Sequence, residues 1–273
     1  MNSQRPLKTA RNRSDHAATA TAVTTMNPKP NRAATVCMSL LLRVNLNTVQ
    51  ISWGRNVNSV KIKPVRRARK AYHHGDLRQR LLAVTEEIIL EQGVEGFTLR
   101  EAARRAGVSP AAPAHHFKDA RGLLTAVALL GFREFGASLA KADTAAGADP
   151  ARRLQEQGLA YVRFALDHPA RFQLMFRHEK LDTDDEEFAA VAKQSYDLLA
   201  SAVRAATGTP PGAELSKNDY GFLLANWSIV HGFAHLALAN QFRDPQGEAV
   251  SAESLLPAML RHLPQLVGSA RAG

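Results

Sequence analysis

The stretch from Phe97 to Phe117, FTLREAARRAGVSPAAPAHHF, has residue types and spacings that suit contact with a nucleic acid. Thr98 and Glu101 have the spacing of a capping box, in which each residue bonds the other's backbone at a helix start. The helix predicted from this cap spans Leu99 to Ala106. It places alanines on one side and arginines on the other, so one face can be buried while the other meets an anionic partner.

The residues that follow predict a tight turn into a second helix. Gly107 supplies the left-handed residue that ends a helix. Ser109 is a favoured cap and Pro110 is tolerated at a first helical position, so we expect the second helix to start there. Two short helices joined by such a turn form a helix-turn-helix, which places its second helix in the major groove of DNA. The alternative is a helical hairpin within an ordinary bundle.

The positive charge is concentrated at the N-terminal end of the chain. The protein has 273 residues and a net charge of +10, but residues 1–75 alone carry a net +13 and the remainder a net −3. This asymmetry indicates a polyanion-binding tail on a nearly neutral body. The alternative is a solvated extension without a function.

Composition narrows the class of protein. Apolar residues make up 45% of the chain, as in a soluble globular protein, and the length allows two domains. Cys37 is the single cysteine, so no internal disulfide can form, and a reducing, cytoplasmic location fits. No apolar run approaches the roughly 20 residues of a membrane span, so no membrane partner is expected.

The chain divides into an irregular start and a long helical part. Residues 1–60 have few acids and no sustained periodicity, which predicts a disordered extension. One hypothesis is that the natural chain begins between Val60 and Lys70, and detection of peptides from residues 1–55 by mass spectrometry would exclude it. Residues 61–71 form a basic arm, expected to lie along phosphates or in the minor groove, or merely to aid solubility.

Apolar spacing, caps and breakers predict an all-α fold beyond the arm. The expected helices are 76–92, 99–106, the short helix from 109, 120–141, 151–166, 170–178, 188–207, 216–241 and 251–267. The predicted domains are a helix-turn-helix domain at 72–122, a helical ligand-binding and dimerisation domain at 123–268, and a tail at 269–273.

These residues resemble the TetR/AcrR family of bacterial transcriptional regulators. The run AYHHGDLRQRLLAVTEEIILEQGVEGFTLREAARRAGVSPAAPAHHFKDARGLLTAV is similar to that family's DNA-binding domain. The segment Trp227-Ser-Ile-Val-His231-Gly232 resembles the W-x-x-x-H-G signature of a subgroup's ligand-binding domain. The resemblance implies a homodimer that binds a roughly palindromic double-stranded DNA operator, most often as a repressor, and is released by a small-molecule effector.

The resemblance also implies how the parts are used. The two long C-terminal helices would pack with those of a second copy, and helix 120–141 would link effector binding to the DNA-binding heads. Two positions depart from the family pattern. Ala114 and Ala120 stand where the family usually has a tyrosine and a lysine that contact phosphates, so we expect weaker binding or binding that depends on the arm. A dimeric ligand-binding protein with weakened or lost operator binding is therefore the alternative function.

The candidate contact residues follow from this assignment. The expected DNA contacts are Lys63, Arg66, Arg67, Arg69 and Lys70 in the arm, Thr98 and Arg100 before the turn, and Ser109, Ala111, Ala112, His115, His116 and Lys118 after it. His115 is the best candidate to bond a base edge, and Ala111 and Ala112 suit thymine methyl groups. The expected pocket residues, for an apolar or amphipathic effector, are Tyr161, Phe164, Phe172, Met175, Phe176, Tyr196, Phe222, Trp227 and His231. The alternative is that aromatic residues at this spacing form core.

Other chemistries have little support in the sequence. His73, His74 and Asp76 lack further metal ligands at a suitable spacing. His231 and His235 have a ligand spacing of four, but no acid lies within that turn, so a buried pair is favoured and no metal or cofactor is expected. The chain has no G-x-S-x-G, P-loop or G-x-G-x-x-G motif, and its one cysteine lies in the irregular start, so no enzymatic activity is expected.

Overall fold

The computed structural model describes residues 74–244 and 246–261, and within these residues the protein is built from helices, with one isolated β-bridge between Arg243 and Ala249. The prediction of an all-α fold is confirmed. The predicted extension at 1–60, the basic arm at 61–71 and the tail at 269–273 lie outside the described residues. The elements are α2 (His74–Gln92), η2 (Val94–Gly96), α3 (Leu99–Ala106), α4 (Ala114–Phe117), α5 (Ala120–Ala146), α6 (Pro150–Asp167), α7 (Pro169–Met175), η3 (His178–Lys180), α8 (Glu186–Thr207), α9 (Lys217–Leu238) and α10 (Ala252–Leu260).

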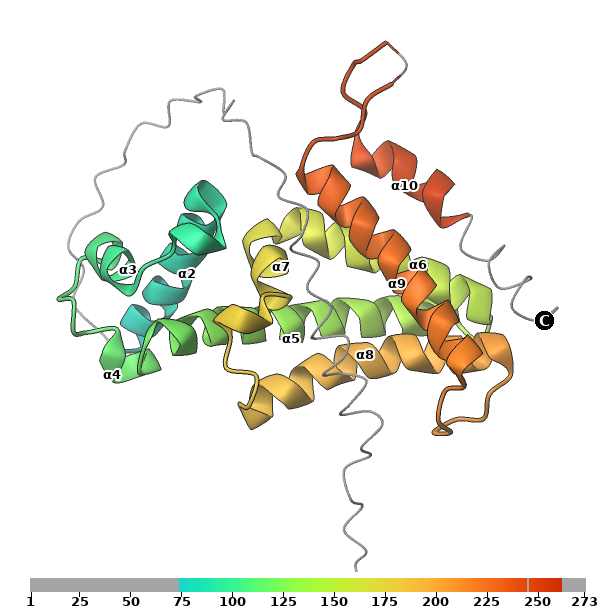
Figure 1. The fold of residues 1–273 in the computed structure, drawn as a ribbon, viewed down its shortest axis with the longest axis horizontal. Helices are drawn as coiled ribbons and strands as arrows, with labels where there is room; N and C mark the ends of the chain where they lie inside the picture. Colours follow the sequence, from blue (N-terminus) through green and yellow to red (C-terminus); the bar gives the residue numbers. More distant parts are fainter. Residues whose placement is uncertain (1–73, 245, 262–273) are drawn as a thin grey trace, which may run out of the picture.

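A small head and a larger body share the helix α5 (Figure 1). The head consists of α2, α3 and α4 at one end of the molecule. From there α5 runs into the body, where α6 and α8 lie along it and α7 crosses it on the side nearest the head. Helices α9 and α10 lie at the far end of the body.

The head folds around the apolar face predicted for α2. Leu81 and Ile88 are fully buried, and Thr85 satisfies its hydroxyl by donating to the carbonyl of Leu81 at 2.7 Å. Small side chains let α3 approach closely, since Ala102 is also fully buried. Burial of these side chains is what holds the two short helices at a fixed angle to α5.

Helix α5 is longer than the predicted 120–141. It begins after Asp119, whose carboxylate accepts from the backbone of Gly122 at 2.8 Å, and it ends at Gly147, where φ is 73°. The residues after Lys141, ADTAA, lie beyond the predicted end of this helix. They continue the helix because alanine is a strong helix former and because the Thr144 hydroxyl bonds the carbonyl of Ala140 instead of competing with the backbone.

Two other helix ends differ from their predictions, and a third is not tested. Helix α9 ends at Leu238 rather than at 241, because Asn240 adopts a positive φ of 52°. Helix α10 is described only from Ala252 to Leu260, while the remainder of the predicted helix 251–267 lies outside the described residues. The segment predicted as helix 170–178 is the short helix α7 followed by the separate turn η3.

Among the described residues, two helices, α5 and α9, are long and apolar enough to cross a membrane by length and composition alone. Both have faces packed into the body, and α5 lies against α6, α7 and α8. A core helix of a globular protein has the same composition, so this finding does not change the fold class.

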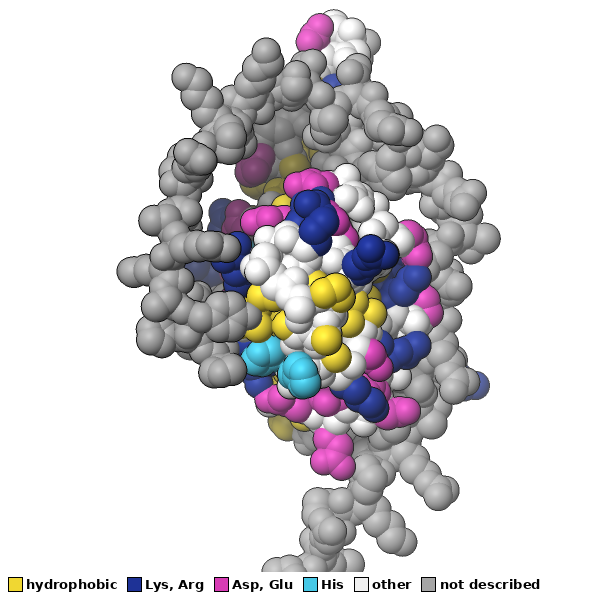
Figure 2. All heavy atoms as spheres, turned by 90° about the vertical axis from the view of Figure 1, so that its left-hand side faces the viewer, with side chains coloured by type: hydrophobic (Ala, Val, Ile, Leu, Met, Phe, Trp, Pro, Cys, Tyr) yellow, Lys and Arg dark blue, Asp and Glu magenta, His cyan; other side chains and the backbone are white. Residues whose placement is uncertain are grey.

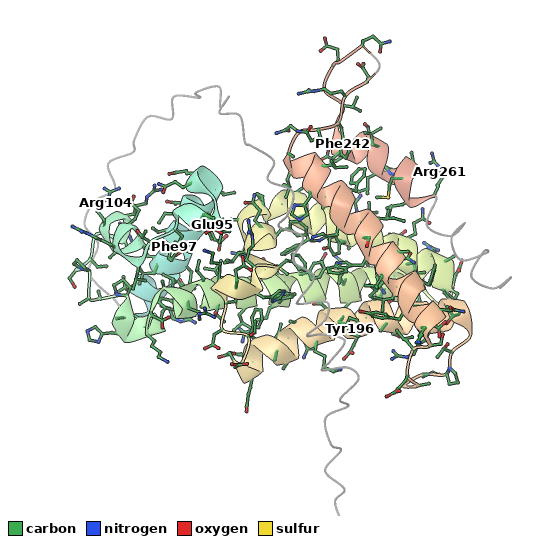
Figure 3. All side chains as sticks on the ribbon, in the orientation of Figure 1. Glu95, Phe97, Arg104, Tyr196, Phe242 and Arg261 are labelled. Carbon is green, nitrogen blue, oxygen red and sulfur yellow. The ribbon has the colours of Figure 1, made fainter. Side chains whose placement is uncertain are left out.

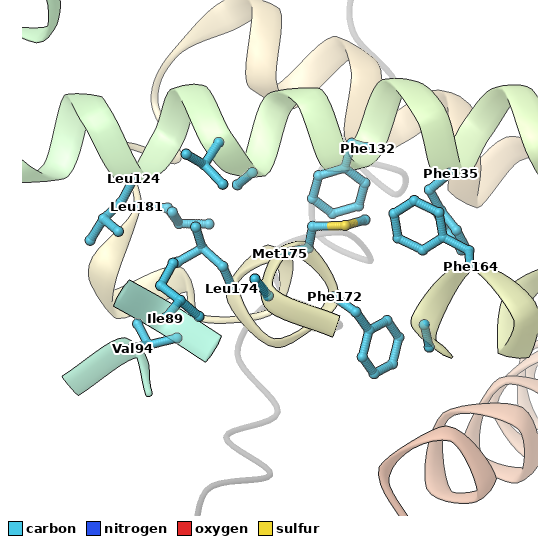
Figure 4. Close-up of a cluster of buried hydrophobic side chains, with 14 of the residues drawn as sticks. Ile89, Val94, Leu124, Phe132, Phe135, Phe164, Phe172, Leu174, Met175 and Leu181 are labelled. Carbon is cyan, nitrogen blue, oxygen red and sulfur yellow. The ribbon is translucent and has the colours of Figure 1, made fainter. Parts of the chain in front are cut away.

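Helices α5 and α7 cross at Gly131, where their backbones come unusually close. A Cβ atom at Gly131 would lie 2.7 Å from the sulfur of Met175 and 3.1 Å from Cβ of Arg171. Figure 4 shows Met175 packed against Phe132 of α5, and Leu174, on the same short helix, directed toward Ile89 of the head. The lack of a side chain at Gly131 is what allows α7 to lie between head and body.

We predict that Gly131→Ala lowers the free energy of unfolding by about 1–3 kcal/mol, because the new methyl group forces α7 away from α5. The measurement is urea denaturation followed by far-ultraviolet circular dichroism. Gly221→Ala in α9 is the matched control, since a Cβ there meets nothing within 4 Å, and it should stabilise the protein by about 0.5–1 kcal/mol. Equal effects of the two substitutions would contradict the proposed close crossing.

Candidate nucleic-acid interface and internal cavity

The first helix of the helix-turn-helix begins at Thr98, whose hydroxyl accepts from the backbone of Glu101 at 3.2 Å. The expected reciprocal half of the capping box is not seen in the structure. The Glu101 carboxylate instead accepts hydrogen bonds from Arg104 and Arg105, each at 2.7 Å, and these bonds lower the pKa of Glu101 to about 2. Two arginine side chains near the carboxylate attract it more strongly than one backbone N–H.

The turn after α3 follows its prediction closely. Gly107 is left-handed, with φ 71° and ψ 33°, and its N–H bonds the carbonyls of Ala103 and Arg104. The N–H of Val108 reaches the carbonyl of Ala103 at 3.0 Å. These bonds satisfy the last carbonyls of α3 and fix the direction in which the chain leaves it.

The second helix does not start at Ser109 and Pro110, so that prediction is wrong. Helix α4 is the single turn Ala114–Phe117, with Pro113 at its N-cap. Because Pro113 has no N–H, the carbonyl of Ser109 accepts from Ala112 instead, at 3.0 Å, and the residues before α4 form turns. The segment after Val108 is therefore a series of turns that ends in one helical turn.

Lys118, at the junction with α5, has a strained backbone. Its φ is 67° and its ψ is −58°, and the N–H of Asp119 bonds the carbonyl of Phe117 at 2.7 Å across it. This is a γ-turn of the rare, high-energy hand, which costs about 1–3 kcal/mol for a residue with a side chain. The strain sets the sharp angle between α4 and α5, and the lysine side chain remains exposed.

The predicted DNA contacts within the described residues lie on the outer surface of the head. Thr98, Arg100, Ser109, Ala111, His115 and Lys118 are exposed, and Ala112 and His116 are half-buried. Figure 2 shows this end of the molecule, where an apolar patch is bordered by histidine and by lysine and arginine side chains. Figure 3 shows Arg104 on the same outer side of the head. The arm residues Lys63, Arg66, Arg67, Arg69 and Lys70 lie outside the described residues.

The two positions that depart from the family pattern belong to this surface. Ala114, the first residue of α4, is exposed, and Ala120, the first residue of α5, is half-buried. Neither side chain can donate a hydrogen bond, so this surface lacks the two donors that the family pattern has at these positions.

The body contains a cavity with an empty volume of about 900 Å³, a figure that includes its open mouth. Its walls come from α5, α6, α8 and α9, from the end of α7 and from the start of η3. The lining residues are Phe132, Phe135, Leu139, Leu154, Gln157, Gly158, Tyr161, Phe176, His178, Ala192, Ser195, Tyr196, Leu199, Leu223, Asn226, Trp227 and Val230. The mostly apolar lining with a few polar groups is that of a small-molecule site.

The predicted pocket residues divide between the cavity and the surrounding core. Tyr161, Phe176, Tyr196 and Trp227 line the cavity. Phe164, Phe172, Met175, His231 and Phe222 are buried and pack in the core around it, outside the lining. Being aromatic therefore does not tell a residue of the cavity wall from a residue of the core, because both places hold large apolar side chains.

The polar residues of the cavity wall were not predicted from the sequence. Gln157, His178, Ser195 and Asn226 all line it. A signal was present for two of them. Asn226 lies one turn from Phe222 and from Val230 on a buried face, and Ser195 likewise shares the buried face of α8. A polar residue at core spacing is the pattern that could have identified them.

A buried polar network joins α6 to α9 beside the cavity. The hydroxyl of Tyr161 lies 2.6 Å from Nδ1 of His231 and accepts from Nε1 of Trp227 at 3.3 Å. Nε2 of His231 lies 3.1 Å from Nε2 of His235. The simplest consistent assignment has Tyr161 donating to His231, which then donates to His235. Trp227 and His231, the first and last residues of the W-x-x-x-H signature, thus both bond Tyr161 and connect α9 to α6.

Both histidines of this network are held in the neutral form. Burial, with a smaller contribution from the neighbouring His235, lowers the pKa of His231 to about 3. Burial, with a contribution from the positive charge of Arg177, lowers the pKa of His235. Burial also raises the pKa of Tyr161, so its hydroxyl stays protonated. Within the described residues no group of three or more His, Cys, Asp or Glu could hold a metal ion.

We predict that acid destabilises the fold through His231. Below about pH 6.5 the unfolded chain binds a proton there and the native protein does not, so the free energy of unfolding falls as the pH falls toward 3. The slope approaches about 1.4 kcal/mol per pH unit for this residue. Urea denaturation between pH 5.5 and pH 4 should show a shallower slope for His231→Gln, whereas His115→Gln on the exposed surface should leave it unchanged. An unchanged slope in His231→Gln would contradict the assignment.

Comparison with known proteins places the head and the body in one family. Residues 81–127 match the model described as bacterial regulatory proteins, tetR family, and residues 154–261 match the model described as tetracyclin repressor-like, C-terminal domain. The matched segments together span more than half of the chain. No curated protein matches the sequence.

Solved structures agree with this arrangement. A protein of unknown function from Rhodococcus sp. RHA1 is 31% identical, with 72% of this chain and 98% of that chain covered and a TM-score of 0.57. The TetR family transcriptional regulator PfmR from Thermus thermophilus is 21% identical, with coverage of 68% and 94% and a TM-score of 0.53. The fatty acid degradation regulator FadR from Bacillus halodurans is 12% identical, with coverage of 68% and 93% and a TM-score of 0.52.

The last two structures are similar in fold alone, and the subgroup suggested by the Trp227 to Gly232 signature stays a prediction. The two family models match the head and the body in the order in which the structure builds them, and this chain therefore belongs to the TetR family of bacterial regulatory proteins.

Proposed function

We propose that this TetR-family transcriptional regulator acts as a homodimeric repressor, which binds a roughly palindromic operator and is released by a small molecule bound in the body cavity. The observation that carries the proposal is the shared helix α5. Its first residues support the exposed surface of the head, and Phe132, Phe135 and Leu139 further along it line the cavity. One rigid element thus belongs to both candidate sites.

The proposed DNA contacts follow from exposure and chemistry. Thr98, Arg100 and Lys118 bind phosphates, while His115 bonds a base edge in the major groove. Ala111 and Ala112 contact thymine methyl groups, with Ser109 and His116 at the margin of the contact. With so few polar groups, the protein depends on DNA shape for part of its specificity. The basic arm, Lys63 to Lys70, adds phosphate contacts that Ala114 and Ala120 do not provide.

The proposed dimer uses the far end of the body. Helices α9 and α10 form the predicted four-helix contact with a second copy, and Leu236 of α9, 46% exposed, supports this because a large apolar side chain there is otherwise in water. A two-fold dimer presents two heads to successive major grooves of one face of DNA. Such a protein acts in the cytoplasm, where the chromosome lies.

The segment formed by α7 and η3 connects the cavity to the head. Phe176 and His178 of this segment line the cavity. Arg171, in α7, bonds Glu86 of the head at 2.9 Å and Glu134 of α5 at 2.5 Å. Lys180, in η3, bonds Glu95 of the head at 2.5 Å. Figure 3 shows Glu95 on the side of the head that faces the body. A ligand that moves this segment would therefore tilt the head.

The alternative function is a dimeric ligand-binding protein that has weakened or lost its operator. Ala114 and Ala120 favour it, because two phosphate contacts of the family pattern are missing. A stable dimer that shows no salt-sensitive affinity for any DNA from a random pool would support this alternative over the repressor.

We predict that Lys118→Gly weakens operator binding and reduces its salt dependence by about 0.9 in the log–log slope for each phosphate that is no longer bound. Glycine suits the positive φ at this position, so the fold should be retained or stabilised. The measurement is fluorescence anisotropy at several salt concentrations, on DNA selected from a random pool by the unaltered protein.

Lys217→Gly, which removes an exposed lysine from the first residue of α9, is the control and should leave the slope unchanged. A chain that begins at residue 71 tests the arm with the same DNA and should also show a smaller slope. If Lys118→Gly and Lys217→Gly bind alike, the proposed DNA surface is misplaced.

We predict that Arg171→Met weakens operator binding by about 5- to 30-fold without changing the salt slope, because the head loses its fixed orientation and every phosphate-binding side chain is kept. Glu86→Gln removes the partner of Arg171 in the head and should weaken operator binding by a similar factor. Arg133→Met, which removes an α5–α8 ion pair with Glu187, is the control within the body. Undiminished affinity in both Arg171→Met and Glu86→Gln would show that this ion pair does not orient the head.

A further inference from the structure

Three buried side-chain polar atoms in the described part of the chain have no hydrogen-bond partner, and all three belong to residues that line the cavity. They are Nδ1 of His178, Oγ of Ser195 and Oδ1 of Asn226. They come from η3, α8 and α9, so they are not the result of one badly placed element. Buried polar groups are nearly always satisfied in folded proteins, and three exceptions around one cavity indicate a missing partner inside it.

The orientation of Asn226 fixes what that partner must carry. Its side chain is 3% exposed, and its Nδ2 donates to the carbonyl of Phe222 at 2.8 Å. The amide oxygen is therefore the free end, and an amide oxygen can only accept. Ser195, 5% exposed, can donate or accept. The ligand must accordingly bring at least one N–H or O–H group.

The cavity provides no counter-charge for an ionised ligand. Among the described residues that line it there is no Lys, Arg, Asp or Glu. The nearby carboxylate of Asp143 already accepts from Arg153 at 2.7 and 2.9 Å and from Gln157 at 2.7 Å. Burial lowers the pKa of His178, which is therefore neutral at pH 7. An unpaired charge would lose its hydration here without compensation.

The rest of the wall is built to hold an apolar body. Phe132, Phe135, Phe176 and Trp227 present rings from α5, α9 and the end of α7, and leucines fill the gaps between them. Rings at these positions favour an aromatic or branched alkyl group over a highly hydrated one.

We propose that the effector is an uncharged amphipathic molecule, with an aromatic or alkyl body and a polar end whose N–H or O–H donates to Asn226. Ser195 and His178 bond the same polar end. That this molecule acts as an effector rests on the proposed function. Its chemical class is argued from the cavity alone.

Four isosteric probes separate charge from hydrogen bonding. The probes share a 4-hexylphenyl body and differ in the polar end. 4-Hexylbenzamide is neutral and has an N–H donor, and 4-hexylacetophenone is neutral and has no donor. 4-Hexylbenzoate is anionic and 4-hexylbenzamidine is cationic. Binding to the full chain carrying Trp53→Phe is followed at pH 7.5 by the fluorescence of Trp227, the one tryptophan that remains, which lines the cavity.

The benzamide should bind at least about tenfold more tightly than the benzoate or the benzamidine, and several-fold more tightly than the ketone. Asn226→Ala should abolish the preference for the benzamide over the ketone while the ketone still binds. Asn218→Ala, at an exposed position near the start of the same helix, should leave the preference unchanged. Tightest binding of a charged probe, no binding of any probe, or an unaltered preference in Asn226→Ala would overturn the inference.

The test is separate from that of the proposed function because no DNA is present. If the benzamide binds with the expected selectivity but leaves the protein on its selected DNA, the ligand class stands and release by the ligand fails. If the benzoate binds best and releases the DNA, release by a ligand stands and the uncharged class fails.

Discussion

The structure depends on how closely α5 and α7 cross at Gly131. The crossing leaves no room for a side chain, so α7 lies against both α5 and the head, and Arg171 reaches Glu86 and Glu134 together. One turn later the same segment supplies Phe176 to the cavity wall. Because packed interiors do not deform continuously, a displacement of this segment by a ligand has to be accommodated by movement of the head or of α5.

Sequence reasoning was most successful where structure is decided locally. The start of α3 after Thr98, its end at Gly107 and the start of α5 at Ala120 each depend on a few neighbouring residues, and each is present in the structure. The start of the second helix was mispredicted although Pro110 and Pro113 were visible in the sequence. A first proline is compatible with a helix start, but a second one three residues later removes the N–H that would continue it, so the helical turn begins only at Ala114.

The cavity was less predictable, because it is made by helices that are distant in the sequence. Tyr161 and Phe172 are both aromatic, buried and at helical spacing, yet only Tyr161 faces the space between α6 and α9. Nothing in the local sequence separates them. The polar residues offered a better guide, since Asn226 interrupts a buried face and the core alone gives no reason for an amide there. A buried hydrogen-bonding group without a partner indicates that the partner comes from outside the part of the chain that the structure describes.

In the proposed function, a DNA surface with few polar groups makes the affinity for DNA sensitive to the orientation of the head. His115 and Lys118 are exposed beside exposed alanines. If the protein binds DNA as proposed, the free energy of binding comes from a small number of contacts, and both heads of the proposed dimer must meet their geometry at once. A ligand shifts such an equilibrium only by its differential affinity for the two arrangements, and moving it from mostly bound to mostly free takes about 5.5 kcal/mol. Hydrogen bonds to Asn226, Ser195 and His178, together with burial of an apolar body, can supply a difference of that order only if one arrangement brings all three atoms within reach and the other does not.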